Sequence, residues 1–254
     1  MFEKVAAYVI ILTKLYCQCS SKDVSIINGS PVKITEVPFM AMYRPKGDSG
    51  RPYHCGAVIV SDRFLLSAAH CYLKTIPKYR VTVGTDNALQ GGQDYDIEET
   101  TVHPKYSKDN NDNDVLVIKI IGKILFSENV RAIAMASPDL KIEEGALMET
   151  MGFGWTNPKE RNSFSNQLLK ITIPCVDQSQ CKEKFFPKLT PTMICAGGTD
   201  KDSCKGDSGG PLTYNNKVVG LVSYGRKTCG QAGVPAVYTR ISAVRDFIDK
   251  VITP

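Results

Sequence analysis

The chain has 254 residues, of which 43% are hydrophobic, and its formal net charge is +5. This length and composition supply a sizeable core, which excludes a disordered chain and allows one large all-β domain or two small ones. The charge is mild and scattered, so nucleic acid is not an expected partner. The sequence contains no internal repeat and no metal-type cluster of cysteine and histidine, so we expect neither a metal nor another cofactor.

Residues 1–19 are typical of a secretory signal peptide. Lys4 gives a positive start, the apolar run Val5–Thr13 follows, and Cys17 and Cys19 stand three residues and one residue before a cleavage point. The apolar run is too short to span a bilayer as a helix, so we expect no membrane attachment. A buried N-terminal strand is the alternative, and it is less favoured because no polar alternation follows the run.

The nine cysteines of the chain also indicate export. A chain with a signal peptide matures in an oxidising compartment, where cysteines form disulfides. Removal of Cys17 and Cys19 with the signal would leave seven cysteines, so one thiol would have no partner. We therefore predict a secreted, extracellular protein that contains disulfides.

Strand-like runs recur at short spacing after residue 25, and glycine, proline and asparagine turns separate them. The predicted strands are Phe39–Tyr43, Gly56–Ile59, Phe64–Ser67, Arg80–Val83, Val115–Ile120, Leu147–Gly152, Leu168–Ile173, Val218–Val222 and Ala236–Arg240. This pattern indicates an all-β barrel or sandwich. Only the C-terminus is predicted to be helical, with Ser242 as the N-cap. Four apolar residues would share one face of that helix: Val244, Phe247, Ile248 and Val251.

A glycine-rich stretch, Asp202-Ser203-Cys204-Lys205-Gly206-Asp207-Ser208-Gly209-Gly210-Pro211, surrounds Ser208 with small residues. Gly206, Gly209 and Gly210 allow a sharp turn and the close approach of a substrate. The backbone N–H groups of Gly206 and Ser208 could converge beside the hydroxyl, as an oxyanion hole requires. A structural turn with an incidental serine is the alternative, and it weakens if the chain also supplies a base and a carboxylate.

A base and a carboxylate are both present. The chain has three histidines, His54, His70 and His103, and His70 follows an apolar strand in a setting of small alanines that would let its imidazole face a cleft. Asp114 directly precedes the apolar run Val115–Ile120, so it is the best candidate for a buried orienting carboxylate. Asp109 and Asp112, in the polar loop before it, are predicted to face solvent.

With His70, Asp114 and Ser208 in this order, the chain resembles the chymotrypsin family of serine proteases, and within it the trypsin-like type. The match extends over residues 26–254. Five segments carry it: Ile26-Ile27-Asn28-Gly29, Ser67-Ala68-Ala69-His70-Cys71, Asp114-Val115-Leu116-Val117-Ile118-Lys119-Ile120, Gly206-Asp207-Ser208-Gly209-Gly210-Pro211 and Pro235-Ala236-Val237-Tyr238-Thr239-Arg240. The resemblance implies an all-β fold with two antiparallel six-stranded β-barrels, about residues 26–135 and 136–241, an active site between them, and a C-terminal α-helix over about 242–252.

The resemblance also implies a role for each residue of the site. Ser208 would attack the scissile carbonyl, His70 would transfer the proton, and Asp114 would orient the imidazole. Gly206 and Ser208 would bind the oxyanion through their N–H groups. Asp202 would form the floor of a pocket that selects arginine or lysine, because a neutral guest would leave that anion unpaired. The other substrate-binding residues that it implies are Ser203, Ser223, Tyr224, Gly225 and Ala236.

Activation and disulfides follow from the same resemblance. Residues 20–25 would be a propeptide, and the freed Ile26 ammonium would pair with Asp207. Activation sites of the family usually end in arginine or lysine, whereas Ser25 stands there in this chain, so we expect a separate, non-tryptic activating protease. The implied cysteine pairs are Cys55–Cys71, Cys181–Cys195 and Cys204–Cys229. They leave Cys175 as either a buried thiol or an intermolecular link.

Some positions depart from the family pattern. Phe153 and Tyr224 replace tryptophans, and Ala236 replaces a pocket glycine. Thr85 stands where calcium-binding relatives have glutamate, so calcium binding is not expected. Lys205, beside the oxyanion hole, would either favour acidic residues on the far side of the substrate or be solvated.

The resemblance implies a monomer whose partners are protein or peptide substrates, an activating protease and protein protease inhibitors. The main rival is a secreted, non-catalytic binding protein on the same fold, and the complete set of three catalytic residues argues against it. A second rival is chymotrypsin-like or elastase-like specificity, which Asp202 disfavours.

Overall fold

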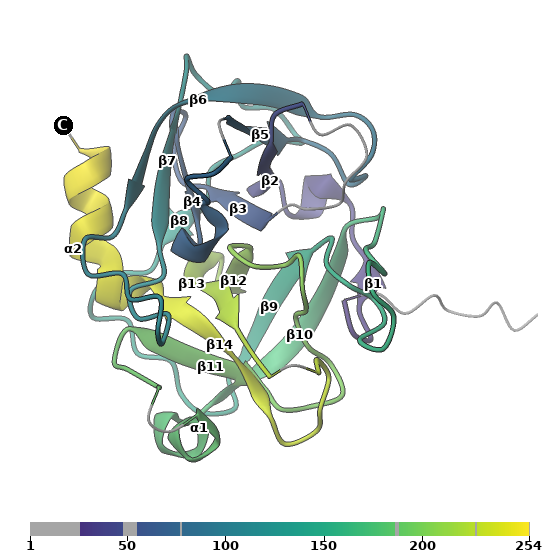
Figure 1. Cartoon of the computed structure of the whole chain (residues 1–254), viewed down its shortest axis with the longest axis vertical. Helices are drawn as coiled ribbons and strands as arrows, with labels where there is room; N and C mark the ends of the chain where they lie inside the picture. Colours follow the sequence, from purple (N-terminus) through teal and green to yellow (C-terminus); the bar gives the residue numbers. More distant parts are fainter. Residues whose placement is uncertain (1–25, 48–54, 77, 186–187, 227, 254) are drawn as a thin grey trace, which may run out of the picture.

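The computed structural model of the chain describes residues 26–47, 55–76, 78–185, 188–226 and 228–253. The predicted signal peptide and propeptide, residues 1–25, and His54 lie outside the described residues. The described part forms two antiparallel β-barrels, one above the other in Figure 1, with the C-terminal helix at their side.

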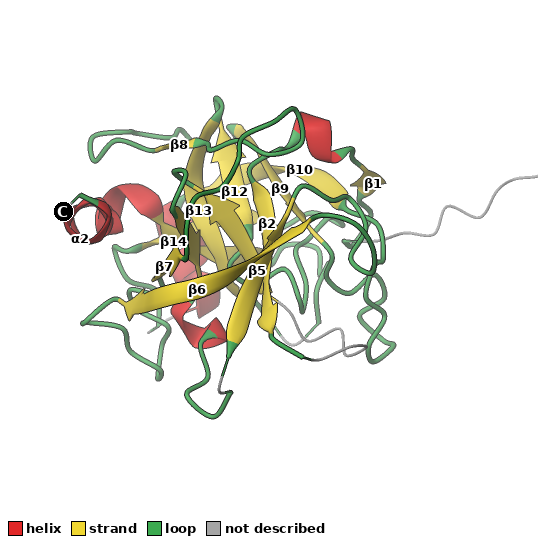
Figure 2. Cartoon of the chain, turned by 90° about the horizontal axis from the view of Figure 1, so that it is seen from above, coloured by secondary structure: helices red, strands yellow, loops and turns green. Residues whose placement is uncertain are grey.

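Six strands close the first barrel in the order β2-β3-β4-β7-β6-β5. Their bounds are β2 (Met40–Pro45), β3 (Cys55–Ile59), β4 (Phe64–Ser67), β5 (Tyr79–Val83), β6 (Gln93–Val102) and β7 (Leu116–Ile120). β6 is the longest strand of the barrel, and it runs across the view from above in Figure 2. The family-implied six-stranded barrel is therefore confirmed.

Strands of the first barrel that read as continuous apolar runs are buried on both faces. On β7, Leu116 and Ile118 point into the core of the first barrel, whereas Val117 belongs to the core of the second barrel and α2. On β4, Leu65 faces the first core and Leu66 the other. Because successive side chains of a strand point to opposite faces, a strand between two cores reads as a nearly continuous apolar run.

The second barrel closes in the order β10-β11-β14-β13-β12-β9, because β9 also pairs with β10. Its strands are β9 (Leu147–Gly152), β10 (Leu169–Val176), β11 (Met193–Gly197), β12 (Pro211–Tyr214), β13 (Lys217–Tyr224) and β14 (Pro235–Arg240). Two short strands join this sheet from outside: β1 (Ser30–Pro31) pairs with β10, and β8 (Ala134–Met135) pairs with β13. The segment that follows Ile26 is thus anchored to the second barrel.

Two α-helices accompany the barrels in the described part of the chain, so the expectation of a single C-terminal helix was wrong. α1 (Gln178–Phe185) is short and buries only Cys181 and Phe185, so it has almost no apolar periodicity to reveal it. α2 (Ile241–Ile252) begins at Ile241 with Arg240 as its N-cap, so Ser242 lies inside the first turn and does not cap the helix.

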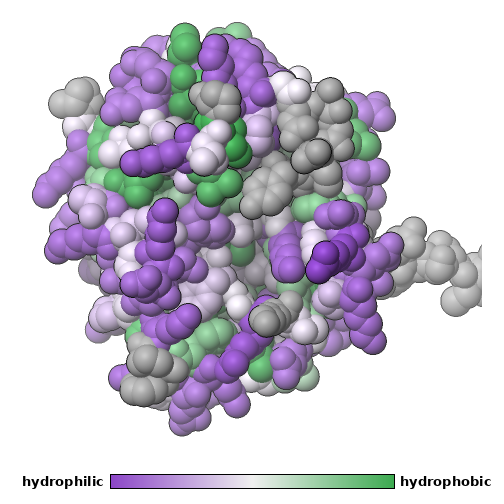
Figure 3. Space-filling view, in the orientation of Figure 1, coloured by the Kyte–Doolittle hydropathy of each residue, from purple (hydrophilic) through white to green (hydrophobic). Residues whose placement is uncertain are grey.

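The predicted apolar face of α2 is confirmed. Val244 and Ile248 are buried, and Phe247 and Val251 pack against the same core. Neither helix of the described chain is long and apolar enough to cross a membrane. Hydrophilic side chains dominate the face shown in Figure 3, and the hydrophobic ones form separate small patches.

The two barrels touch at three glycines beside Ser208. The N–H of Gly56, on β3, donates to the Ser208 carbonyl at 2.8 Å. A Cβ atom on Gly56 would lie 2.6 Å from the Gly210 Cα, and one on Gly209 would lie 2.2 Å from the Ser67 hydroxyl oxygen. Gly209 therefore admits the backbone of the first barrel beside Ser208, whereas a Cβ on Gly210 would lie 2.8 Å from the Asp207 carbonyl oxygen of its own turn.

We predict that Gly56→Ala destabilises the protein by about 2–3 kcal/mol, because the added methyl group overpacks a backbone-to-backbone contact. Thermal unfolding in a Ser208→Ala background measures this without self-cleavage. Gly225→Ala is the matched control, since a Cβ at Gly225 would meet nothing within 4 Å. Equal melting temperatures for Gly56→Ala and Gly225→Ala would contradict the close contact.

Candidate active site

Asp114 is a fully buried carboxylate whose hydrogen bonds hold His70. One oxygen accepts the backbone N–H of His70 at 2.9 Å, and the other lies 2.7 Å from His70 Nδ1 and accepts the Ser223 hydroxyl at 2.5 Å. The carbonyl of Asp114 accepts the Thr239 hydroxyl at 2.8 Å. A carboxylate at Nδ1 favours the tautomer with the proton on that nitrogen, so Nε2 is left as an acceptor. A histidine held in this way can act as a general base.

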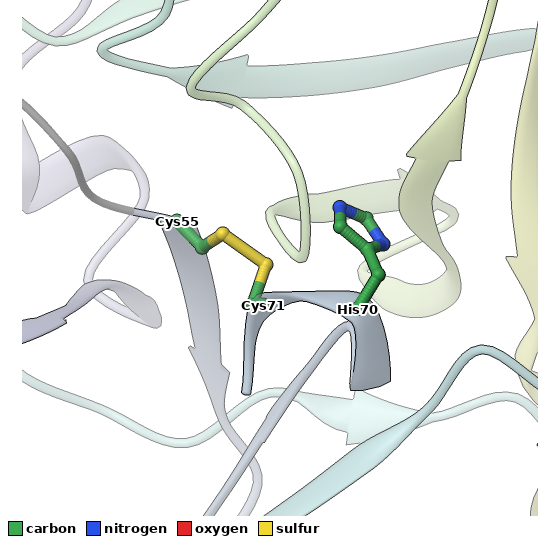
Figure 4. Close-up of side chains that lie close together, drawn as sticks. All are labelled: Cys55, His70 and Cys71. Carbon is green, nitrogen blue, oxygen red and sulfur yellow. A yellow bond between two sulfur atoms is a disulfide. The ribbon is translucent and has the colours of Figure 1, made fainter. Parts of the chain in front are cut away.

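His70 lies on a 3-10 turn, Ala69–Cys71, which the disulfide between Cys55 and Cys71 fastens to β3 (Figure 4). The Cys71 sulfur lies 3.8 Å from the carbonyl oxygen of Ser208, so this turn stands beside the serine of the second barrel. The ligand atoms of Cys55, His70 and Cys71 lie within 4.8 Å of one another. Both sulfurs are joined in the disulfide and offer no thiolate, so the group is a structural link and not a metal centre.

The backbone around Ser208 has two free donors. Gly209 N–H donates to the Val222 carbonyl and Asp207 N–H to the Cys204 carbonyl. The N–H groups of Gly206 and Ser208 have no acceptor among the described residues. Gly206 has a φ of +98°, and a Cβ there would lie 2.7 Å from the ring of Phe164, so only glycine fits.

Asp207 is buried without a cationic partner in the described part of the chain. Its two oxygens accept the N–H groups of Gly154 and Cys204, each at 2.8 Å. Burial raises the pKa of this carboxyl to about 7. Ile26, whose ammonium the sequence analysis expects to pair with Asp207, is itself fully buried.

A cavity of about 300 Å³ opens beside Ser208. All six predicted substrate-binding residues line it: Asp202, Ser203, Ser223, Tyr224, Gly225 and Ala236. The disulfide between Cys204 and Cys229 joins two segments of its wall. Ser203 is buried, with its hydroxyl 3.3 Å from that of Tyr238.

Asp202 supplies a buried and half-satisfied carboxylate to this cavity. One oxygen accepts the Gly230 N–H at 2.8 Å, and the other is buried with no partner among the described residues. Burial raises the pKa of Asp202 to about 6. An anion that lacks one hydrogen-bond partner at the base of a cavity is matched by a cationic guest.

Asp112 and His103 make packing and hydrogen-bond contacts that hold the fold together. Asp112 is not solvated as expected, because one of its oxygens accepts the hydroxyls of Thr190 at 2.6 Å and Thr192 at 2.5 Å. These bonds tie the loop before Asp114 to the second barrel. His103 packs edge-on against Phe247 of α2, and burial lowers its pKa.

The remaining cysteines also have defined positions. A disulfide links Cys181 and Cys195, as the resemblance implied. Cys175 is a buried thiol, and burial raises its pKa. Its placement in the core favours the buried-thiol alternative over an intermolecular link.

The two barrels, with the site at their junction, have the chymotrypsin fold. A family model described as Trypsin matches residues 26–248. Trypsin 5G1 of Aedes aegypti is 34% identical over 232 residues, which cover 89% of this chain and 84% of that protein. The vitellin-degrading protease of Bombyx mori is 32% identical over 236 residues, which cover 91% and 87%.

A solved structure is similar as well. Neuropsin, a serine protease expressed in the limbic system of mouse brain, matches with a TM-score of 0.79 at 28% identity, over 88% of this chain and 98% of neuropsin. The chain belongs to the trypsin family of serine proteases.

We predict that Asp202→Asn stabilises the empty protein by about 3 kcal/mol at pH 8. The unfolded carboxyl loses its proton near its ordinary pKa of 3.8, whereas the folded one keeps it up to about pH 6. The folded state therefore binds more protons, and its stability falls as the pH rises through this window. The substitution removes this loss of stability. The gain in the free energy of unfolding should therefore be small at pH 4 and reach its full size at pH 8.

Unfolding of Asp202→Asn at both pH values, in a Ser208→Ala background, tests this expectation. Asp200→Asn changes an exposed aspartate of the same loop and is the matched control. A gain of equal size at pH 4 and pH 8 would show that the Asp202 carboxylate carries no burial cost.

Proposed function

We propose that this protein is a secreted serine endopeptidase that cleaves peptide bonds after arginine or lysine. The observation that supports it best is the combination of a carboxylate-held His70 with a cavity whose buried floor contains the half-satisfied carboxylate of Asp202. The first would supply a base for Ser208. The second would bind a cationic side chain in the cavity, because such a side chain pairs with the Asp202 carboxylate. Ser208 lines that cavity, and the turn that carries His70 lies beside the Ser208 carbonyl.

In the proposed reaction, Nε2 of His70 takes the proton of Ser208 as its hydroxyl oxygen attacks the scissile carbonyl. Asp114 stabilises the imidazolium that forms. The free N–H groups of Gly206 and Ser208 receive the developing oxyanion, in positions fixed before the reaction begins. His70 then returns the proton to the leaving amine, and water hydrolyses the acyl-enzyme by the same steps.

The non-catalytic binding protein remains the alternative on this fold. The free oxyanion donors and the buried Asp114–His70 pair favour catalysis over it, since a binding protein needs neither. An apolar specificity is disfavoured, because a neutral guest would leave the second oxygen of Asp202 without a partner.

Specificity can be tested with paired peptides that end in arginine, lysine or phenylalanine before the scissile bond. We expect kcat/KM to be about 10⁴-fold higher for the cationic residues than for phenylalanine.

Ala236 is buried in the cavity wall, where its methyl group narrows the pocket. We therefore expect Ala236→Gly to cleave these peptides faster and to change the ratio of arginine to lysine cleavage. Ser208→Ala is the control for contaminating protease, and a preference for phenylalanine would refute the proposed specificity.

We further propose that the protein is made as a zymogen that is cleaved between Ser25 and Ile26. The buried Asp207 has no cation among the described residues, and a new ammonium at Ile26 would supply one. Because Ser25 is not basic, trypsin should not activate the precursor. N-terminal sequencing of active protein isolated from its source should begin at Ile26, and a different start would refute this activation step.

A further inference from the structure

Two cations stand at the mouth of the Asp202 cavity, and neither forms an ion pair with a carboxylate in the described part of the chain. They are Lys205 and Arg226, both exposed and both among the residues that line the cavity. The cavity thus has a negative floor and a positive rim. The positive rim would interact with the substrate residues on either side of the cationic side chain that enters the cavity.

An aromatic ring holds each cation in place. The Lys205 ammonium lies 4.5 Å from the centre of the Trp155 ring, and the backbone N–H of Trp155 donates to the backbone carbonyl of Lys205 at 2.8 Å. The Arg226 guanidinium lies 5.5 Å from the centre of the Phe185 ring and donates to the carbonyl of Lys184. A ring positions each cation, and the Lys184 carbonyl helps to position Arg226. Neither contact neutralises a charge, so both cations remain available to an anion.

Along an extended substrate, the two cations would lie on opposite sides of the scissile bond. Substrate residues before that bond are numbered P1, P2, P3 and P4 away from it, and the two after it are P1′ and P2′. A substrate that adds a strand along Ser223–Gly225 brings its P3 or P4 residue to Arg226, which directly follows that segment. Lys205 precedes Gly206 of the proposed oxyanion hole and therefore faces the leaving-group side.

We propose that the substrates of this protein carry a cationic P1 residue flanked by acidic residues, one at P3 or P4 facing Arg226 and one at P1′ or P2′ facing Lys205. The inference rests on the proposed function and specifies the substrate class of the same site. It follows from charge alone: the rim attracts carboxylates and repels the arginine- and lysine-rich sequences that a cation-selective pocket would otherwise accept. Substrate choice is thereby narrowed to basic residues in acidic surroundings.

The test compares peptides with lysine at P1 that differ only by glutamate or glutamine at P3, P4, P1′ or P2′. We expect glutamate to raise kcat/KM by about three- to fivefold on each side at low salt, as exposed ion pairs of this kind allow. In 1 M salt the Debye length falls to about 3 Å, so the preference should approach one.

Charge reversal separates the two sides. Arg226→Glu should invert the glutamate-to-glutamine ratio on the P3–P4 side and leave the ratio on the P1′–P2′ side, and Lys205→Glu should do the opposite. Lys250→Glu, on the exposed end of α2, makes the same change in net charge and should alter neither ratio. A general loss of structure would lower all rates together and could not produce these side-specific inversions.

Two negative results are distinguishable. If wild-type protein cleaves lysine peptides equally with glutamate or glutamine on both sides, the acidic-flank inference is wrong and the proposed function stands. A preference that persists in 1 M salt also overturns the inference, because it cannot then come from these exposed charges. If no arginine or lysine peptide is cleaved at all, both proposals fail.

Discussion

The contact between the two barrels at Gly56, Gly209 and Gly210 is the constraint on which the site depends. His70 and Asp114 belong to the first barrel, whereas Ser208 and Asp202 belong to the second. A base can reach a nucleophile on another barrel only if the two backbones approach closely, and here a Cβ on either side would clash. The hydrogen bond from Gly56 to the Ser208 carbonyl sets the position of the serine directly. Glycine at Gly56 and Gly209 is therefore a packing requirement of the junction that carries the candidate site.

Three buried carboxylates meet their desolvation cost in different ways. Asp114 is satisfied within the protein by His70 and Ser223, so it needs no further partner. Asp202 and Asp207 are incompletely compensated, and burial raises the pKa of each. Under the proposed function, the substrate completes one and the cleaved N-terminus completes the other. The buried carboxylates of Asp202 and Asp207 thus lower the stability of the protein at the two sites where we expect a cation to bind.

The sequence predicted the elements whose residue pattern reports directly on burial. Strands β4 and β9 were predicted with their observed bounds, and the apolar face of α2 was correct. β6 was missed because none of its side chains is fully buried and four of its ten residues are acidic. Two of these acidic residues pair with Arg80 and Lys119 of the neighbouring strands. The partners of Asp112 could not be predicted, because Thr190 and Thr192 come from a distant segment that only the fold brings near.

The central claim is that His70 and Asp114 activate Ser208 across the barrel junction. Labelling of the protein cleaved before Ile26 with a fluorophosphonate, followed by mass spectrometry, tests it most directly. We expect a single adduct, on Ser208, and labelling slowed by several orders of magnitude in His70→Ala and Asp114→Asn. Labelling of another residue would contradict the claim. So would a labelling rate in either variant that equals the rate of the unsubstituted protein.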